Sequence, residues 1–496
     1  MLDRQVPDMA NLEELIEKFQ SGTVSRRDFM KKLVLAGFSL SAVGAIVAAC
    51  SSSSPSASVG SGGGSSPVPP GTTPTAAQGA PVEITFTHWD PNQLATAFPP
   101  AVTAFNKIFP NIKVNLVQVP YAEFWSKLTT GMAAGTAPDV FVDLNNFVEQ
   151  FEANNTLLDL APFVAKDSVD LTAFAPGIVD TFRKGSGLYG LPWAVDTIGV
   201  FYNMDLLAKA GVTAVPASLT WAPDGSGTLV PFLQKLTVDK NGVTADKAAF
   251  DPANIVQYGY GMSPDSTQSF AGPFMLSDGG GYQMALDGPP TINQAANVET
   301  YQFISDLMYK YHVSPPGSTV VPPNGGAESD QFLSGKVAVL QTGDWYVQPF
   351  FTGAKFKLGI GALPTGPKGN IGTINGGCSS IFGGTKHPQE AWEFVKFISS
   401  TAGQQIIAGA GAVQSSLTAL GTVFTDAWKA KGLACDTLAT EWTQGKVVSV
   451  PTGKNINAVQ TATDNQVVNI YLNKGTVKDA LDKAQADATS AYAGNS

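Results

Sequence analysis

The chain has 496 residues, which is too long for one hydrophobic core, so at least two domains or lobes are expected. Hydrophobic residues make up 44% of it and charged residues 14%, a composition typical of a globular protein and not of a disordered one. The net charge of −10, with no basic patch beyond residue 32, argues against nucleic-acid binding, and three cysteines are too few for a disulfide scaffold.

The beginning of the chain resembles an export signal. Arg26 and Arg27 precede an apolar stretch, residues 33–49, that is too short and too rich in small residues to be a comfortable membrane span. Positive charge before an apolar run is what an export signal needs, and the paired arginines resemble those of a twin-arginine signal. An ordinary basic leader for general secretion is the alternative, so the sequence leaves the export route open.

A lipid anchor is predicted at Cys50. The sequence Val47-Ala48-Ala49-Cys50 resembles the lipobox of bacterial lipoproteins, in which the cysteine becomes the new amino terminus and carries the lipid. Ordinary cleavage after an Ala-x-Ala-like site is the alternative. Residues 51–81 are rich in serine, glycine and proline and predict a flexible linker. We therefore expect a protein outside the cytoplasm, in a periplasm or on the outer face of the cytoplasmic membrane, anchored through a lipid on Cys50.

Strands and helices alternate at the start of the folded part. Hydrophobic patterns predict strands over residues 82–89, 112–119 and 139–142 and helices over residues 99–109 and 123–134. This order is typical of a parallel sheet, in which ligands bind beyond the carboxyl ends of the strands. Candidate ligand-binding residues therefore follow the first and third strands: Trp89, Asp90, Asp143 and Asn146.

A second α/β region is predicted from about residue 199 to 356, with its clearest helix over residues 298–311, and a later helix begins at Pro388. Motifs for metal, phosphate or serine-hydrolase chemistry are missing from the sequence. We therefore expect no cofactor, no metal and no enzymatic activity. The sequence leaves open whether Cys378 and Cys435 pair.

Several short motifs occur in the same order as in one protein family. They are Gly135-Thr136-Ala137-Pro138-Asp139, Leu188-Tyr189-Gly190-Leu191-Pro192, Ala194-Val195-Asp196 with Tyr202-Asn203-Met204-Asp205, Gly343-Asp344-Trp345, Ala362-Leu363-Pro364 and Glu390-Ala391-Trp392. Together they cover nearly all of residues 82–410. The chain thus resembles the extracellular solute-binding proteins of ABC importers, in the branch that contains the maltose-binding proteins.

The resemblance implies an α/β protein with the two-lobed, type II fold of periplasmic binding proteins. Lobe one is expected to comprise residues 82–196 and 365–413, and lobe two residues 197–364 and 414–496. Hinge crossovers would join the lobes, which would close over a ligand bound between them.

A sugar ring needs flat aromatic platforms for its C–H faces and planar acceptors for its hydroxyl groups. The resemblance implies that Trp345 stacks on a sugar ring and that Asp196 accepts hydrogen bonds from sugar hydroxyls near the crossover. A core tryptophan and a hinge aspartate are the alternatives. Trp193 is interpreted either as a cleft platform or as simple packing. The backbone from Asn375 to Gly377 could present N–H groups to hydroxyls, with a plain turn as the alternative.

The sequence also departs from the maltose-binding pattern. Asp143 occupies the position of a stacking tryptophan of the family, and Asn146 falls near the polar ligands of that site. The family's glutamate and tyrosine are replaced by Thr267 and Ser269. These changes keep polar chemistry but predict a different sugar, so maltose specificity is not transferred.

We expect a monomeric binding protein that captures a carbohydrate, of unspecified identity and chain length, and delivers it to the permease subunits of an ABC transporter. A binding protein for another polar solute, such as a polyamine or a polyol phosphate, is one alternative. A glycoside hydrolase is the other, with Asp143 and Asp196 as its acid and nucleophile.

Overall fold

The computed structural model describes residues 80–282, 289–321 and 327–494. Arg26, Arg27 and Cys50 lie outside the described residues, as does nearly all of the predicted linker. Within the described ranges, no helix combines the length and the apolar character that a membrane span requires.

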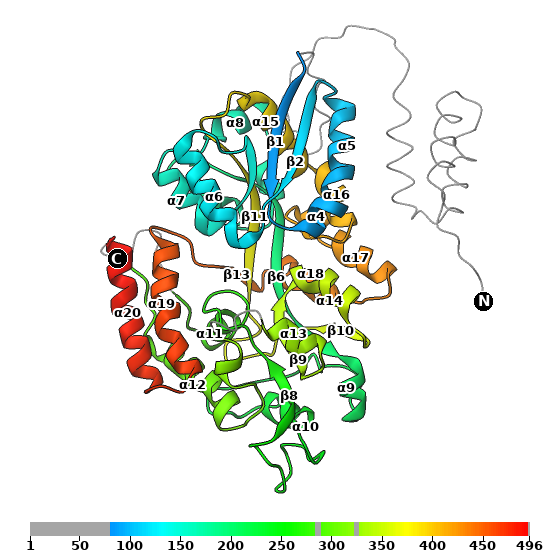
Figure 1. Cartoon of the computed structure of the whole chain (residues 1–496), viewed down its shortest axis with the longest axis vertical. Helices are drawn as coiled ribbons and strands as arrows, with labels where there is room; N and C mark the ends of the chain where they lie inside the picture. Colours follow the sequence, from blue (N-terminus) through cyan, green and yellow to red (C-terminus); the bar gives the residue numbers. More distant parts are fainter. Residues whose placement is uncertain (1–79, 283–288, 322–326, 495–496) are drawn as a thin grey trace, which may run out of the picture. The chain divides into compact units, whose positions relative to one another are not determined.

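The first part of the fold is the predicted parallel sheet. Strands β1 (Val82–His88), β2 (Ile112–Gln118) and β3 (Val140–Leu144) run parallel, with β1 in the middle (Figure 1). Helices α5 (Phe98–Ile108) and α6 (Tyr121–Ala134) make the two crossovers. The alternation predicted from the sequence is therefore confirmed, and the three carboxyl ends lie at one edge of the sheet.

Most strands of the described residues belong to one sheet with the order β2-β1-β3-β11-β6-β9-β8-β7. Strand β11 (Gly372–Ile381) lies antiparallel to both β3 and β6 (Leu191–Asn203). Strand β9 (Val337–Gly343) lies antiparallel to β6 and parallel to β8 (Ile255–Gly261). The smaller strands are β4 (Arg183–Lys184), β5 (Gly187–Leu188), β7 (Val238–Asp239), β10 (Leu358–Gly361), β12 (Gln414–Ser415) and β13 (Val447–Ser449).

Two sets of hydrophobic residues divide along strand β6. Val195 belongs to a core that also contains residues of β1, β3, α5 and α15, whereas Ile198 belongs to a core with residues of α10, α11, α12 and α19. A third, smaller cluster joins α13, α14, α17 and α18. We call the part built on the first core lobe one, and the part built on the other two lobe two. Strand β6 is therefore a crossover between them.

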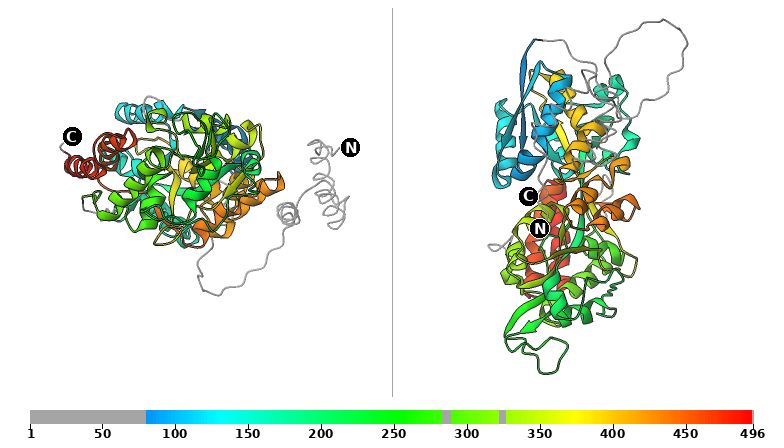
Figure 2. Two further views of the ribbon diagram at one scale, coloured as in Figure 1. Left: turned by 90° about the horizontal axis from the view of Figure 1, so that it is seen from below. Right: turned by 90° about the vertical axis from the view of Figure 1, so that its right-hand side faces the viewer.

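The remaining helices are divided between the two lobes. In lobe one they are α4 (Pro91–Thr96), α7 (Asn145–Ala153), α8 (Ala161–Asp167), α15 (Pro388–Ser399) and α16 (Thr401–Gly409). In lobe two they are α9 (Met204–Lys209), α10 (Leu229–Leu236), α11 (Ala271–Asp278), α12 (Ala295–Tyr309), α13 (Ala327–Leu333), α14 (Val347–Gly353), α17 (Val423–Ala430), α18 (Asp436–Thr443), α19 (Ile456–Tyr471) and α20 (Val477–Ala493). Helices α19 and α20 pack side by side (Figures 1 and 2).

The predicted lobe boundaries stay a prediction. The change of core between Val195 and Ile198 falls beside the predicted boundary at residue 196. Leu417, Leu420 and Trp442, however, pack in the core of lobe one, although the predicted boundaries place them in lobe two.

The Gly-Thr-Ala-Pro-Asp motif has a structural explanation. Helix α6 ends at Gly135, whose φ of +69° is the left-handed conformation that glycine adopts without cost. Four residues later, Asp139 accepts hydrogen bonds from the Thr85 backbone N–H and the Thr385 hydroxyl. The motif thus ends helix α6, and its aspartate, just before β3, forms hydrogen bonds to β1 and to the segment after β11.

Candidate functional site

The crossover brings two predicted site residues together and places a third next to a contact of one of them. Asp196 on β6 lies directly opposite Asn375 on β11, and residues opposite each other in an antiparallel pair share one face of the sheet. The Asp196 carboxyl is hydrogen-bonded to that of Asp344, which follows β9 and immediately precedes Trp345. Asp196 and Asn375 therefore lie together at the crossover, and Trp345 directly follows the residue that Asp196 contacts, although these segments come from distant parts of the sequence.

Burial raises the pKa of both carboxyl groups of this pair. Burial raises the pKa of Asp196 to about 6, against the lowering effect of its hydrogen bond with Asp344, and the negative charge of Asp90 raises it further. Burial and the charge of Asp196 hold the pKa of Asp344 well above its usual range. Two adjacent carboxyls in a poorly solvated position cannot both ionise easily, so the pair retains a proton at mildly acidic pH.

Asp344 is held in place from lobe one. The Gln414 Nε2 donates to Asp344 Oδ2 at 2.6 Å and to Thr197 Oγ1 at 2.8 Å. The Trp442 indole N–H donates to Gln414 Oε1 at 3.1 Å, which fixes the orientation of that amide. The carboxyl pair is therefore positioned by a buried network and leaves the half-buried Asp196 as its accessible member.

Trp345 lies in a 3₁₀ helix (Asp344–Tyr346) that begins where β9 ends. Its ring folds back over Gly343, because a Cβ at that glycine would lie 1.9 Å from a ring carbon. The side chain is half-buried and packs against the core of lobe two. The glycine before Asp344 therefore gives the indole its position and leaves part of it accessible.

Asp90 links the site to the first strand. Its Oδ1 accepts hydrogen bonds from the backbone N–H groups of Asn92 and Gln93, so Asp90 is the amino-terminal cap of α4. Just before it, His88 is buried, and burial lowers its pKa to about 3, against the opposing effect of its hydrogen bond with Gln93. The histidine is therefore neutral and supports the acidic side chain structurally.

A cavity of about 310 Å³ lies next to Asn375. Thr373 Oγ1 donates to the backbone carbonyl of Gln268 at 2.8 Å, and the Asn375 amide lies 3.5 Å from Gln268 Oε1. Residues of β11, of the segment around α11 and of the segment after β13 line this cavity: Thr267, Gly272, Met275, Leu276, Gly280, Gly281, Tyr282, Thr373 and Val448 to Thr452. Its volume is in the range of small-ligand sites.

Three predicted residues lie inside lobe one. Trp193 is 2% exposed and packs against Phe98, with ring centroids 5.2 Å apart. Asp143 is fully buried, and burial raises its pKa to about 7 despite hydrogen bonds from the Leu144 backbone N–H and the Ser380 hydroxyl. Gly377 lies in the middle of β11 and pairs on both sides. Their contact with a ligand stays a prediction.

Asn375 to Gly377 form part of a strand and not a turn, because β11 continues through them to Ile381.

Asn146 lies in the first turn of α7, and its Nδ2 donates to Asn457 Oδ1 of α19 at 2.9 Å. The Asn457 Nδ2 donates to the Asn146 backbone carbonyl and to Gln150 Oε1, both at 3.1 Å. Asn146 therefore joins lobe one to lobe two.

Trp89 belongs to an aromatic cluster at the ligand edge of lobe one. Its ring lies 5.6 Å from Tyr121 and 5.5 Å from Trp125, measured between centroids. It is half-buried, and Tyr121 is 54% exposed. Sequence reasoning assigned no role to these two partners of Trp89.

Other residues of the site also escaped the sequence analysis. Asp344 lies in the Gly-Asp-Trp motif, directly before Trp345, and this place in the motif could have identified it as a candidate site residue. Gln414 and Asn457 carry no local motif, because their partners are distant in the sequence: Asp344 is 70 residues from Gln414, and Asn146 is 311 residues from Asn457.

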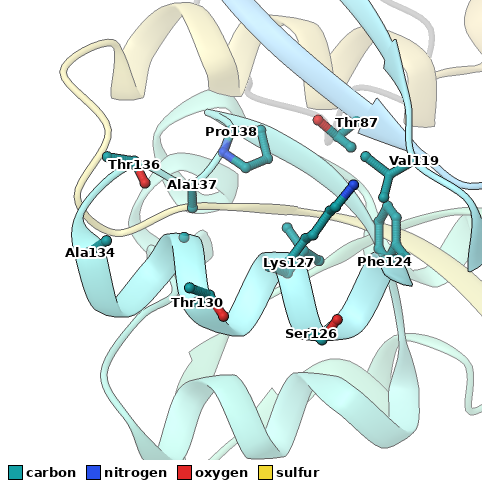
Figure 3. A pocket seen from close by; sticks show the side chains of 12 residues that line it. Thr87, Val119, Phe124, Ser126, Lys127, Thr130, Ala134, Thr136, Ala137 and Pro138 are labelled. Atoms are coloured by element: carbon teal, nitrogen blue, oxygen red, sulfur yellow. The ribbon is translucent and has the colours of Figure 1, made fainter. Parts of the chain in front are cut away.

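A second cavity lies along α6, at the side of the glycine motif (Figure 3). It has a volume of about 470 Å³, and Thr87, Phe124, Lys127, Thr136 and Pro138 are among its lining residues. None of the predicted ligand-binding residues lines it.

Within the part of the chain that the structure describes, no group of three or more metal-ligating side chains is assembled.

The comparison with known proteins covers the segments that build this site. Residues 89–405 match the family of bacterial extracellular solute-binding proteins. The chain belongs to this family. The match covers both sides of the crossover and includes Asp196 and Trp345.

Two curated relatives come from Bacillus subtilis (strain 168). An arabinooligosaccharide-binding protein is 27% identical over 343 residues, which are 66% of this chain and 72% of that protein. A galactooligosaccharide-binding protein is 27% identical over 284 residues, or 56% of this chain and 59% of its own length.

Solved structures have the same fold. The structure of UspC from M. tuberculosis is 30% identical with a TM-score of 0.67, over 83% of this chain and all of that one. The maltose/maltodextrin-binding domain MalE of Bdellovibrio bacteriovorus, bound to maltotriose, is 21% identical with a TM-score of 0.65, over 82% of this chain and 98% of that one. This solute-binding protein therefore has the two-lobed α/β fold that the sequence predicted.

Proposed function

We propose that this solute-binding protein captures a carbohydrate at the β6 crossover, outside the cytoplasm, and delivers it to the permease of an ABC transporter. The observation that carries the proposal is the pairing of Asp196 with Asn375 and the contact of Asp196 with Asp344, the residue directly before Trp345. Carboxylate and amide oxygens accept hydrogen bonds from sugar hydroxyls, and an indole face attracts the C–H face of a sugar ring. The oligosaccharide-binding names of its relatives agree with this chemistry.

The geometry disfavours a glycoside hydrolase. Asp143 lies opposite Cys378 on β11 and Asp196 lies opposite Asn375. Residues 375 and 378 of a strand point to opposite faces of the sheet, so the two carboxyls lie on opposite faces as well. A pair of catalytic carboxyls must flank one glycosidic bond, which this arrangement does not allow. The family also consists of binding proteins.

A polyamine is the second candidate ligand, because Asp90, Asp196 and Asp344 concentrate negative charge. The Asp196–Asp344 pair, however, holds a proton and so presents less than its full charge. Trp345 beside a neutral or singly charged carboxyl pair suits a polyhydroxylated ring better than a polycation.

The proposal includes export through the Arg26–Arg27 signal and attachment to the membrane through a lipid on Cys50. The family's extracellular location supports export. Metabolic labelling of the full chain with a fatty acid, compared between wild type and Cys50→Ser, tests the anchor. Label that persists in the variant would reject it.

The ligand proposal is tested by calorimetric titration with arabino-, galacto- and malto-oligosaccharides and with spermidine. Trp345→Ala should weaken sugar binding by about 1–3 kcal/mol, because a buried aromatic anchor carries this much binding energy. Phe351→Ala is the control, since Phe351 is an exposed aromatic of the same lobe away from the crossover. Unchanged affinity in Trp345→Ala, or binding of spermidine alone, would contradict the proposal. Release of new reducing ends would contradict a role without catalysis.

A further inference from the structure

The fully buried Asp143 of β3 takes part in a series of contacts that depends on its protonation. Its Oδ1 accepts a hydrogen bond from the Leu144 backbone N–H at 2.8 Å. Its Oδ2 lies 3.0 Å from Ser380 Oγ on β11, and the same Oγ lies 2.8 Å from the backbone carbonyl oxygen of Tyr189. We call these last two contacts the Ser380 bridge. It joins β3, β11 and the connection that leads into β6.

The Ser380 bridge needs two hydrogens, and the serine hydroxyl has only one to give. The Tyr189 carbonyl oxygen can only accept, so the second hydrogen must come from Asp143. Protonated Asp143 donates to Ser380 Oγ, and the Ser380 hydroxyl then donates to the Tyr189 carbonyl. When Asp143 is ionised, the hydroxyl serves either the carboxylate or the carbonyl, and one contact of the bridge is lost. The bridge is therefore complete only when Asp143 carries a proton.

The surroundings of Asp143 favour its neutral form. Burial raises the pKa of the Cys378 thiol, opposite Asp143 on β11, well above its usual range, so the thiol is neutral. His88 of the neighbouring strand β1 is neutral as well, and burial also raises the pKa of the Tyr189 phenol. Acidic groups of α7 and α15, which pack on these strands, pair with lysines: Glu149 and Glu152 with Lys184, and Glu393 with Lys396. Burial accordingly raises the pKa of Asp143 to about 7.

The Ser380 bridge fastens two segments that lead into the binding site. Strand β3 continues directly into α7, where Asn146 contacts lobe two through Asn457. On the other side, the connection held by the bridge runs into β6, which carries Asp196 at the crossover. This connection lies tightly on β11, because a Cβ at Gly190 would lie 2.3 Å from Cys378 Sγ. A change at the bridge therefore reaches both segments.

We propose that protonated Asp143 is a positioning residue of the binding site, which holds the segments of Asn146 and Asp196 in the arrangement that binds the ligand. The inference rests on the proposed function and adds a pH dependence to it. Asp143 acts through Ser380 and needs no contact with the ligand. Because the binding arrangement requires the proton, ligand and proton each favour binding of the other, and affinity falls as pH rises through neutrality.

The test compares the wild type with Asp143→Asn, whose amide N–H₂ donates to Ser380 at every pH and cannot ionise. The full chain is titrated calorimetrically with the trisaccharides of the arabino-, galacto- and malto- series. From about pH 6 to about pH 8.5, the wild type should lose about fivefold more affinity than Asp143→Asn, since a pKa change of one unit is tenfold in an equilibrium. The Asp196–Asp344 pair is present in both proteins, so its own titration cancels in the comparison.

A second measurement needs no ligand. Ser380→Ala removes the bridge, so amide hydrogen exchange of residues 188–191 at one fixed pH should become faster by at least about threefold. Asp143→Asn keeps the bridge and should exchange like the wild type. Ser379→Ala is the matched control, because Ser379 is the equally buried neighbour on β11, and its Oγ has no hydrogen-bond partner among the described residues. Its exchange and its affinity should stay near those of the wild type.

The outcomes separate this proposal from the proposed function. The positioning role is overturned if the wild type and Asp143→Asn lose affinity equally with pH. It is also overturned if Ser380→Ala exchanges no faster than Ser379→Ala. If no glycan binds the wild type, the carbohydrate proposal fails, and the exchange measurement still decides whether the bridge holds these segments. Thermal unfolding shows whether each variant keeps the fold.

Discussion

At the scale of single residues, the site depends on a carboxyl pair that would repel if both members were charged. Asp344 is 3% exposed and depends on Gln414 and the backbone N–H of Thr197 for its polar contacts besides Asp196. A proton between Asp196 and Asp344 converts repulsion into a hydrogen bond. The unfolded chain, in which both acids have ordinary pKa values, releases that proton at a lower pH.

This difference predicts how stability varies with pH. The folded pair retains a proton over a pH range in which the unfolded chain has already lost it, so the free energy of unfolding falls as pH rises. The fall begins near about pH 4, continues through the raised pKa of Asp196, about 6, and extends to the raised pKa of Asp344. Asp344→Asn places a neutral amide where the protonated carboxyl stands. The fall between pH 5 and pH 8, measured by chemical denaturation, should shrink by more than about 1 kcal/mol, since one pKa unit corresponds to about 1.4 kcal/mol.

Glu83→Gln is the control for this measurement, because Glu83 is an exposed acid paired with Lys113. Its pH profile should follow the wild type. An Asp344→Asn profile as steep as that of the wild type would show that the pair holds no proton in the folded protein.

At the scale of elements, function depends on how each strand ends. Strand β9 ends at Gly343, and the chain turns at once into the 3₁₀ helix that carries Asp344 and Trp345. Strand β1 likewise ends just before Asp90, which caps α4. In both places a candidate site residue lies in the short segment that follows a strand, so the local sequence there also has to form a turn or a helix cap.

Gly343→Ala tests this interpretation of the Gly-Asp-Trp turn. The added Cβ would lie 1.9 Å from a ring carbon of Trp345, so the indole must move. Ligand affinity should fall at least fivefold, and the free energy of unfolding should fall by about 1–3 kcal/mol, as expected for overpacking. Titration and chemical denaturation measure the two effects.

Gly353→Ala is the matched control, because a Cβ there has only ordinary contacts with Leu333 at 3.6 Å. Both its affinity and its stability should stay near those of the wild type. Undiminished ligand affinity in Gly343→Ala would show that the position of the indole is not set by this glycine.

At the scale of the whole molecule, the two lobes touch through amide side chains as well as through the crossover. Asn457 of α19 makes hydrogen bonds to the side chain and the backbone of Asn146 and to Gln150, both in α7. The cores behind these helices are separate. The contact therefore favours the arrangement of the lobes in this structure without merging their cores.

Asn457→Ala removes all of these hydrogen bonds together. Because each contributes about 0.5–1.5 kcal/mol, amide hydrogen exchange at the amino-terminal turns of α7 and α19 should become faster by at least about threefold. Asn465→Ala is the control, since Asn465 is exposed on the same helix. Exchange in α7 that is unchanged by Asn457→Ala would mean that the contact does not hold the lobes together.

Local order along the chain was sufficient to predict part of this protein. The parallel strands and the helix from Pro388 followed from hydrophobic periodicity, which is a local property of the sequence. The two-lobed fold and the solute-binding family followed from the resemblance of several short motifs to those of a known family. Asp196 and Trp345 became candidates through the same resemblance, since each lies within or beside one of its motifs, and their contact with a ligand stays a prediction.

Only the tertiary structure decided which side chains meet. Asp344 pairs with Asp196, Gln414 holds Asp344, and Asn146 bonds to Asn457 because sheet register and lobe packing bring distant segments together. Burial likewise placed Trp193 and Asp143 inside lobe one, since an aromatic or acidic residue type does not reveal which face of a strand lies in the core. The pKa of each acid follows from that placement, so the chemistry of the site is a property of the folded chain.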